Sequence, residues 1–396
     1  MSAKKKMPSA KTECLVIIND GNYFARHKAA LLQPLLEQAR VTVASGGLTD
    51  SIPQPFVVEK IDVSRRMLTI RSDFSLLVSL IGLFRRKQPQ LILCFTMKPT
   101  IYGLIAAMLP FSHLDRRARF VGQLPGLGVL FERQGWLGTL ARKMSVSIIR
   151  RAANQLNFHL VFENFSDRAL FVSQGYVRSE QTTVLSGTGI NLGAYSLPSA
   201  RDPEKVSILW AGRLVKGKGL DLFCGAAQKL ASEGHPNVRF LVAGLQDVNS
   251  AESIPPEQLA GLLASPAITF LGHDCHIPDL LSRVDVLCHP SRYKEGLPRI
   301  LLEAAASGVA IVASENFGTK QIVTHGQTGL LAEELTSESI AAELKLLIDN
   351  PNFRKRMADN AFKLVNSGGF DTREVTKELL SALDLPFLAV SPKVHG

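Results

Sequence analysis

The stretch from 285 to 308 constrains the fold of this chain more than any other. Asp285-Val-Leu-Cys-His289 is short and apolar, as expected for a buried strand, and residues 290–297 carry the turn residues of a loop. Pro298 at a first helical position and Gly308 beyond the last turn then bracket a helix. A strand, a loop and a helix N-terminus in this order predict the ligand-binding edge of an open α/β sheet.

Two glutamates give this edge a chemical character. Glu295 lies in the loop just before the helix, and Glu303 lies in the second helical turn. The free N–H groups of Gly296 and Leu297 point out of the helix start, where the helix dipole favours an anion. A carboxylate beside an anion site is explained if it holds the hydroxyls of a sugar attached to a phosphate. The alternative is a surface loop with two solvated glutamates.

The alternation of strands and helices runs through both halves of the chain. Glu13 to Asn19 predicts a buried strand, Gly21 a turn, and Tyr23 to Gln38 the first helix of a parallel βαβ unit. The polar segment 197–205 contains two prolines, and the alternation restarts after it. We therefore expect an α/β protein with two Rossmann-like parallel-sheet domains that face each other across a cleft. These are residues 1–199, residues 200–369, and a C-terminal helix within 370–396 that packs back on the first domain.

Charge and cysteine content narrow the class of protein. The 396 residues are 46% hydrophobic and 20% charged, which is typical of globular chains. Residues 1–200 carry a net charge of +13 and the remainder −3, so the first half is expected to meet an anionic surface. Nucleic acid fits less well than a membrane, because aromatic residues are only 7% and no recognition-helix motif is present. The five cysteines form no CxxC pair and indicate buried thiols in a reducing compartment.

Residues 73–84 form the most apolar segment, and Arg85, Arg86 and Lys87 follow it directly. Twelve helical residues are too short to cross a bilayer, which needs about 20. The segment is either a buried crossover helix or a helix lying on the membrane with the three basic residues on lipid headgroups. The start of the chain lacks the apolar region of a signal peptide, so we expect a cytoplasmic protein.

A second loop, 211–219, supplies positive charge. Arg213 and Lys218 follow a strand and lie among glycines, including Gly212. A guanidinium fork and an ammonium group suit a diphosphate, and glycines let the backbone approach it, although a basic surface turn has the same composition. The P-loop pattern, a DxD pair, an HExxH motif and a Cys/His cluster are all missing. We therefore expect no metal and no cofactor, with fixed positive charge stabilising a leaving group.

These residues carry a resemblance to a known family. Gly212-Arg213 with Lys218, and Glu295-Gly-Leu-Pro-Arg with Glu303, resemble the donor-site signature of glycosyltransferase family 4, including its E-x7-E element. The resemblance implies the GT-B fold, a nucleotide-sugar donor, and metal-independent transfer with retention of anomeric configuration. It also implies that Arg213, Lys218 and the amides of Gly296 and Leu297 hold the diphosphate. Glu295 would then face the donor sugar and Glu303 the ribose hydroxyls.

The first half resembles one branch of that family. The stretches that carry the likeness are 23–27, 95–103, 126–131, 162–167 and 186–190. The branch consists of bacterial transferases that extend undecaprenyl-diphosphate-linked sugars in O-antigen, capsule or protein-glycosylation pathways. The resemblance implies a polyprenyl-diphosphate-linked saccharide as acceptor and an enzyme bound peripherally to the inner face of the plasma membrane. Gly21, Lys98, Gly126 and Gly128 are the candidate contacts to acceptor phosphates.

The function that we predict is transfer of a sugar from a nucleotide-sugar, a UDP-linked hexose or N-acetylhexosamine, to this lipid-linked acceptor. Two alternatives stay open from sequence. A non-catalytic binding or scaffold protein of the same fold would have lost turnover, against which the retained Arg213, Lys218, Glu295 and Glu303 speak. A nucleotide-sugar epimerase of the same fold would act on the nucleotide-sugar alone and would not need a basic, apolar first half.

Overall fold

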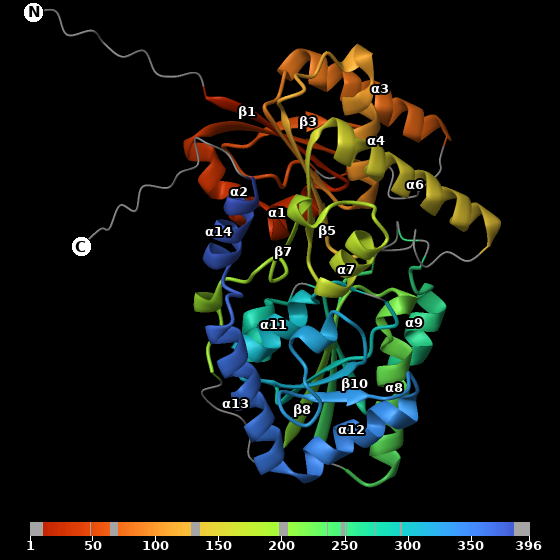
Figure 1. Cartoon of the computed structure of the whole chain (residues 1–396). Coiled ribbons are helices and arrows are strands. Elements are labelled where there is room, and N and C mark those ends of the chain that lie inside the picture. Colours follow the sequence, from red (N-terminus) through yellow and green to blue (C-terminus); the bar gives the residue numbers. More distant parts are fainter. Residues whose placement is uncertain are drawn as a thin grey trace, which may run out of the picture. The chain divides into compact units, whose positions relative to one another are not determined.

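The computed structural model describes residues 11–47, 49–63, 70–127, 135–197, 205–235, 237–246, 250, 252–273, 275–293 and 295–383. The chain forms two compact units (Figure 1). Unit 1 contains the residues up to Thr188 together with those from Val375 onward, and unit 2 contains Gly189–Glu374. Each unit is built on its own parallel sheet, as the sequence predicts.

The described residues of unit 1 form a seven-stranded parallel sheet in the order β3-β2-β1-β4-β5-β6-β7. The central strands are mostly apolar because helices cover both faces of the sheet. The strand order reverses between β1 and β4, which is the switch point of this sheet. The strands are β1 (Thr12–Ile18), β2 (Ala39–Ser45), β3 (Val57–Lys60), β4 (Leu91–Phe95), β5 (Arg119–Leu124), β6 (Asn157–Phe162) and β7 (Thr182–Val184).

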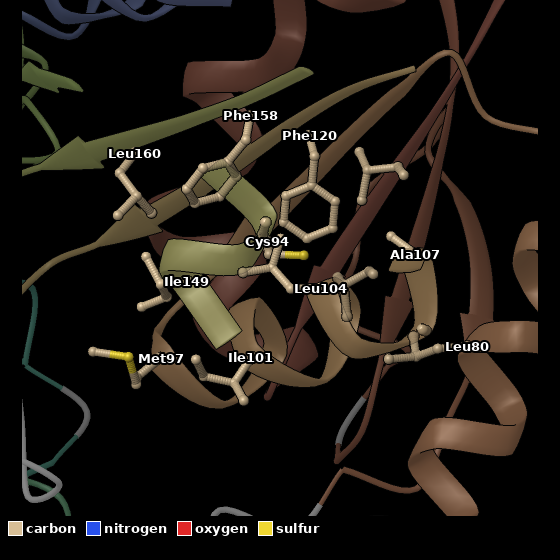
Figure 2. Packing of buried hydrophobic residues seen from close by; sticks show 14 of the residues in the cluster. Leu80, Cys94, Met97, Ile101, Leu104, Ala107, Phe120, Ile149, Phe158 and Leu160 are labelled. Carbon is tan, nitrogen blue, oxygen red and sulfur yellow. The ribbon is translucent and has the colours of Figure 1, made fainter. Parts of the chain in front are cut away.

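Helices α3, α4, α6 and α7 pack on one face of this sheet, with α4 between α3 and α6 (Figure 1). Figure 2 shows this core, in which Leu104 of α4 lies between the strand residue Phe120 and Leu80 of α3. Helices α1, α2 and α14 cover the other face. The helices are α1 (Gly21–His27), α2 (Ala29–Leu32), α3 (Ile70–Lys87), α4 (Met97–Met108), α6 (Trp136–Gln155), α7 (Phe165–Ser173) and α14 (Thr372–Leu383), with 3-10 helices η1 (Gln33–Glu37), η2 (Pro110–Ser112) and η3 (Ser179–Gln181).

The predicted helix from Tyr23 to Gln38 is divided into α1, α2 and η1. The break falls at Lys28, whose side chain is buried, with Nζ 3.4 Å from Oε1 of Glu163 and 5.0 Å from the centre of the Phe95 ring. A buried long-range ion pair therefore lies at the junction of α1 and α2, and Pro34 lies at the start of η1.

The described residues of unit 2 form a six-stranded parallel sheet in the order β10-β9-β8-β11-β12-β13, which reverses between β8 and β11. Helices α8 and α12 cover one face, and α10 and α11 cover the other. The elements are β8 (Val206–Ala211), β9 (Val238–Ala243), β10 (Ile268–Gly272), β11 (Val286–His289), β12 (Ala310–Ser314), β13 (Leu330–Ala332), α8 (Leu220–Ser232), α9 (Pro256–Leu263), α10 (Ile277–Leu281), α11 (Arg299–Ala306), α12 (Ser337–Asp349) and α13 (Pro351–Ser367), with η4 (Leu192–Ala194), η5 (Lys216–Lys218) and η6 (Thr319–Gln321).

The boundary between the units lies at 188/189, whereas the sequence places it at 199/200. The reason is Ile190, which is fully buried in the core of unit 2 and bonds through its backbone N–H to the carbonyl of Phe370. At the other end, Val375 and Leu379 of α14 are buried with β1 and β2 in unit 1. Residues 384–396 of the predicted C-terminal helix lie outside the described residues. Among the helices of the described ranges, none has the combination of length and apolar character needed to cross a lipid bilayer.

Candidate active site

The switch point of the unit 2 sheet brings the two predicted loops together. Strands β8 and β11 are hydrogen-bonded neighbours, so the loops that leave their carboxyl ends start side by side at one edge of the sheet. The loop after β8 carries Gly212, Arg213 and Lys218, and the loop after β11 carries Glu295. Lys218 and Glu295 are 77 residues apart in the sequence, yet their side chains are in direct contact.

Lys218 and Glu295 form a two-pronged ion pair. Lys218 Nζ donates to Oε1 of Glu295 at 2.8 Å and to Oε2 at 2.7 Å. Only 16% of the Lys218 side chain and 19% of the Glu295 side chain are exposed. The hydroxyl of Ser291 also donates to Oε1, at 2.5 Å, and Nε2 of the buried His289 lies 3.7 Å from the same oxygen. The carboxylate is thereby fixed from three sides.

This setting keeps Glu295 ionised. Burial by itself would raise the pKa of its carboxyl group, but the charge of Lys218 and the contacts with His289 outweigh burial and hold the pKa well below its usual range. Glu295 is therefore a fixed negative charge and a hydrogen-bond acceptor at neutral pH, and not a proton donor.

The two loops are also joined through their backbones. The N–H of Arg292 donates to the carbonyl of Gly217 at 2.8 Å, and the Arg292 guanidinium grips both carboxylate oxygens of Asp221 at 2.8 and 2.7 Å. Gly219 has a φ of +70°, and a Cβ at this position would overlap the carbonyl oxygen of Pro290. Glycine is therefore required where the loops touch.

A third loop supports the start of α11. Ser314, at the end of β12, donates its hydroxyl to the carbonyl of Ser291 at 2.6 Å. Gly318 packs so closely on the turn at Gly296 that a Cβ would overlap the Gly296 carbonyl oxygen. Gly296 and Leu297 are buried, and their backbone N–H groups have no hydrogen-bond partner among the described residues. These groups precede α11, where the dipole of a helix start favours an anion.

Arg213 lies at the exposed side of the same edge. Its positive charge acts on the phenol of Tyr293, which lies in the loop after β11. Burial of the ring and the nearby Glu252 raise the pKa of Tyr293, and Arg213 opposes that rise. An arginine and a lysine therefore lie on the loop after β8, and the amides of Gly296 and Leu297 lie on the loop after β11.

Glu303 is buried in the second turn of α11, and its Oε1 accepts two hydrogen bonds. One comes from the hydroxyl of Tyr195 at 2.9 Å and the other from Nε of Arg299 at 2.7 Å. The sequence reasoning assigned no role to either donor, or to Ser291 and His289. Arg299 precedes Glu303 by four residues, a spacing that is readable as a helical ion pair. Tyr195 is 108 residues away and left no local signal.

The candidate phosphate contacts of unit 1 lie near its own switch point. Gly21 begins α1 directly after β1, and its N–H donates to the carbonyl of Gly46 at 3.2 Å. Lys98 lies in the first turn of α4, but it is buried, with Nζ 2.6 Å from Oδ1 of Asp73. Gly126 follows β5, and Gly128 lies outside the described residues. The positive charge of Lys98, which we predicted to contact an acceptor phosphate, is therefore paired with Asp73.

Residues 73–84 form a helix with two different faces. Leu76, Leu80 and Leu83 of α3 are buried against the sheet, whereas Phe74 and Val78 are more than half exposed. At the end of the helix, the basic run is partly engaged with Glu59. Nζ of Lys87 lies 3.2 Å from one carboxylate oxygen and Nη2 of Arg86 lies 3.8 Å from the other.

A larger exposed apolar surface lies on α6. Four side chains in the first half of this helix, Trp136, Leu137, Leu140 and Met144, are between 49 and 74% exposed. Trp136, Leu140 and Met144 are spaced by four residues, which places them on one helix face. Lys143 is exposed within this stretch. We call these four apolar residues the α6 stripe; the sequence analysis overlooked their spacing.

Among the described residues, no cluster of His, Cys, Asp and Glu side chains could hold a metal ion.

Comparison with known proteins shows which enzymes the chain resembles. Residues 197–364 match the family described as "Glycosyl transferases group 1". The chain is 26% identical over 277 residues to N,N'-diacetylbacillosaminyl-diphospho-undecaprenol alpha-1,3-N-acetylgalactosaminyltransferase of Campylobacter jejuni, covering 67% of this chain and 69% of that protein. It is 23% identical to the capsular polysaccharide biosynthesis glycosyltransferase CapM of Staphylococcus aureus, covering 80% of this chain and 82% of CapM.

Solved structures agree in fold. The crystal structure of Anabaena Alr3699/HepE in complex with UDP-glucose superposes with a TM-score of 0.74 at 18% identity, covering 94% of this chain and 99% of that one. The apo form of the lipopolysaccharide outer core galactosyltransferase WaaB has a TM-score of 0.65 at 13% identity, covering 94% and 99%. Residues 197–364 therefore match a group 1 glycosyltransferase domain, the fold is GT-B, and the protein is a glycosyltransferase.

Proposed function

We propose that the protein is a retaining, metal-independent glycosyltransferase of family 4 that uses a UDP-linked hexose or N-acetylhexosamine as donor. The observation that carries this proposal is the ion pair of Lys218 with Glu295 at the switch point of unit 2, beside Arg213 and the open amides of Gly296 and Leu297. A sugar diphosphate needs positive charge for its phosphates and acceptors for its sugar hydroxyls, and these groups stand side by side here.

The geometry suits departure of a nucleoside diphosphate. An ammonium group has three N–H donors, and the two bonds from Lys218 to Glu295 use two of them. The third is available to a phosphate oxygen without loss of the ion pair. When the bond between the anomeric carbon and the phosphate oxygen breaks, the oxygen keeps the electron pair. Lys218, Arg213 and the two amides then stabilise the new negative charge.

Glu295 acts on the sugar side of that bond in this proposal. Because its carboxylate stays ionised, it accepts hydrogen bonds from donor hydroxyls and places negative charge near the anomeric carbon, where positive charge develops. The acceptor hydroxyl attacks that carbon, and its proton passes to the departing diphosphate oxygen as the new glycosidic bond forms. Glu303, farther along α11, is assigned to the ribose hydroxyls.

The acceptor that we propose is a saccharide on a polyprenyl diphosphate, in assembly of a bacterial surface polysaccharide or glycan. The names of two Campylobacter jejuni relatives specify undecaprenol-diphosphate-linked saccharides, which supports this acceptor class. The net charge of +13 in the first 200 residues suits an anionic lipid. The α6 stripe and the exposed Phe74 and Val78 supply apolar side chains for the interface of the membrane's inner face.

Thermal unfolding in the presence of UDP, GDP, ADP and their glucose and N-acetylglucosamine derivatives tests the donor site. A ligand at 100 times its Kd stabilises the folded state by about 2.7 kcal/mol. We expect UDP and one UDP-sugar to raise the Tm, and Arg213→Ala to weaken the effect of both. No shift with any nucleotide would contradict the donor site. Consumption of the UDP-sugar into its epimer without an acceptor would favour the epimerase alternative.

A transfer assay then tests the acceptor. The stabilising UDP-sugar is incubated with a short saccharide on undecaprenyl diphosphate or on a shorter polyprenyl diphosphate, with and without EDTA. We expect a product one sugar longer, in equal amount with the chelator, and with the anomeric configuration of the donor. Transfer to the free saccharide at the same rate would contradict a lipid-diphosphate acceptor. Loss of activity with EDTA would contradict metal independence.

A further inference from the structure

We propose that Tyr195 is a positioning residue that fixes the Glu303 carboxylate, so that its second oxygen selects nucleotides carrying ribose hydroxyls. The proposal rests on the proposed function, in which Glu303 faces the ribose. Tyr195 precedes the residues that match the family, which begin at 197, and the sequence patterns assign it no role. It nevertheless donates directly to Glu303, across 108 residues of sequence.

The hydrogen bonds to Glu303 are one-sided. Oε1 accepts from the hydroxyl of Tyr195 at 2.9 Å and from Nε of Arg299 at 2.7 Å. A carboxylate oxygen has two lone-pair directions, and both on Oε1 are thus in use. Oε2 has no hydrogen-bond partner among the described residues. An entering pair of hydroxyls therefore meets Oε2 as the acceptor.

Tyr195 is suited to hold the carboxylate in one orientation. Burial of the ring and the negative charge of Glu303 raise the pKa of the phenol, so the hydroxyl stays protonated and donates. An arginine alone leaves a carboxylate free to exchange its two oxygens by rotation of the terminal torsion. A second donor from a different direction opposes this rotation.

The segment that carries Tyr195 is anchored in unit 2. Ile190 is fully buried, and its backbone bonds to the carbonyl of Phe370 at 3.0 Å and to the N–H of Thr372 at 2.9 Å. Arg299 Nη1 also donates to the carbonyl of Gly189 at 3.3 Å. Arg299 therefore holds both Glu303 and the segment that delivers Tyr195. The hydroxyl of Tyr195 is held relative to α11 by these contacts and is not on a freely moving arm.

Binding of UDP and of 2′,3′-dideoxy-UDP, measured by calorimetry on the full chain, tests the proposal. Because a hydrogen bond to a charged acceptor is strong, we expect the wild-type protein to prefer UDP by roughly tenfold or more. In Tyr195→Phe the preference should fall several-fold, through weaker binding of UDP, with the Kd of the dideoxy compound unchanged. Tyr176→Phe, which removes a hydroxyl from a partly buried tyrosine in unit 1, should leave the preference as in wild type.

Other results separate the two proposals. If the wild-type protein binds no UDP, the UDP donor site fails and the role of Tyr195 fails with it. If UDP binds with the expected preference and Tyr195→Phe keeps that preference, the donor site stands and Tyr195 has no positioning role. Equal weakening of both nucleotides in Tyr195→Phe would assign the hydroxyl to folding alone and would also overturn the proposal.

A double-mutant cycle covers the case in which Tyr195→Phe lowers stability. Glu303→Gln removes the charged acceptor, and we expect it to abolish most of the preference for UDP by itself. In the Glu303→Gln background, Tyr195→Phe should then change the preference by less than about twofold, because the two residues act as one unit. An undiminished effect of Tyr195→Phe without the Glu303 carboxylate would show that Tyr195 acts by another route and would overturn the proposal.

Discussion

The carboxyl-end loops of unit 2 and the helical layer of unit 1 differ in the kind of side chain they present and in whether those side chains are paired. In the loops, charged groups are paired with one another, as in Lys218 with Glu295 and Arg292 with Asp221. On the helices, large apolar groups such as Trp136 and Phe74 face solvent. Fixed charges at hydrogen-bond distances suit a small ligand of defined shape. Scattered apolar groups in a basic unit suit a broad surface that needs no exact fit.

Because of this difference, we expect the two regions to respond differently to substitution. A substitution in the loops should act on one ligand and one step, with a large effect. A substitution on the helical layer should act on membrane affinity, with smaller effects that add up over several residues. Each experiment below either strengthens that contrast or removes it.

The largest expected effect is that of Glu295→Ala on sugar transfer. Loss of the carboxylate removes the contacts that we propose to the donor sugar and leaves Lys218, whose side chain is largely buried, without its partner. By analogy with removal of a charge-stabilising group from other active sites, we expect kcat to fall roughly a hundred- to a thousandfold. Steady-state transfer from the stabilising UDP-sugar measures the effect. Retention of wild-type turnover would remove Glu295 from the site and leave unit 2 with an ordinary surface loop.

Glu295→Gln provides the control for folding. The amide keeps the shape of the side chain and can still bond to Ser291, while the negative charge is lost. We expect the same fall in kcat with less change in thermal stability than in Glu295→Ala. If Glu295→Gln were fully active, the role of this position would be steric and not electrostatic.

The sequence was sufficient to predict the sheets and the loops of unit 2, because their signals are local. Glu295 and Lys218 each follow an apolar strand within a few residues, and Pro298 marks the start of α11. Parallel strands bring such positions to one edge without further information. The pairing of Lys218 with Glu295 follows from this topology once β8 and β11 are neighbours.

The sequence was insufficient wherever a contact is distant and specific. Lys28, at the junction of α1 and α2, is paired with Glu163, which is 135 residues away. Tyr195 donates to Glu303 although it lies just before the polar segment 197–205, which separates the two predicted domains. Exposure on α6 depends on which helix face meets the sheet, and a pattern containing Trp136, Leu140 and Met144 at helical spacing is more commonly a core face.

The next largest effect concerns the α6 stripe. Trp136→Glu with Leu140→Glu and Met144→Glu removes three exposed apolar groups and adds three negative charges. If the stripe enters an anionic interface, partitioning onto phosphatidylglycerol-containing vesicles should fall by roughly a hundredfold or less. The matched control replaces exposed apolar residues of unit 2 by the same glutamates, at Phe270, Leu335 and Leu346. We expect the control to bind vesicles far more tightly than the α6 variant.

A variant of the basic residues at the end of α3 provides a second test of vesicle binding. Replacing Arg85, Arg86 and Lys87 by glutamate should weaken vesicle binding less than the α6 variant does, because two of the three already lie near Glu59. The assay is co-sedimentation over a range of salt concentrations. Equal binding by the α6 variant and the wild-type protein would mean that the stripe meets solvent or a protein, and the contrast between the units would disappear.

A smaller effect is expected from Gly318→Ala on stability. The backbone at Gly318 is compatible with alanine, so the obstacle is the overlap of the added Cβ with the carbonyl groups of Gly296 and Glu295. The loops would have to move apart, at a cost of about 2 kcal/mol. Gly261→Ala is the matched control, because a Cβ there meets no atom within 4 Å. Equal unfolding free energies for the two variants would show that the loops are not packed as tightly as described.

The smallest effect is a pH dependence that separates Glu295 from Glu295→Gln. The folded protein holds the pKa of Glu295 below its usual value, because Lys218 and His289 outweigh burial. The ion pair therefore stabilises the fold above the unfolded pKa of about 4.3 and loses this contribution as the pH falls toward the folded pKa. We expect the difference in unfolding free energy between wild type and Glu295→Gln to be constant near neutral pH. It should shrink below about pH 4.3, by an amount on the order of 1 kcal/mol.

Lys218→Met decides whether this pH dependence comes from the ion pair. Without the ammonium group, burial pushes the pKa of Glu295 upward, and the contacts with His289 and the Ser291 hydroxyl oppose this rise. The stabilising contribution above pH 4.3 should then vanish or change sign when Lys218→Met is compared with the double variant Lys218→Met/Glu295→Gln. Denaturant unfolding at several pH values gives all four free energies. If the pH dependence survives loss of Lys218, a group other than Lys218 lowers the pKa of Glu295. The loops of unit 2 would then no longer differ from the helices of unit 1 by their paired charges.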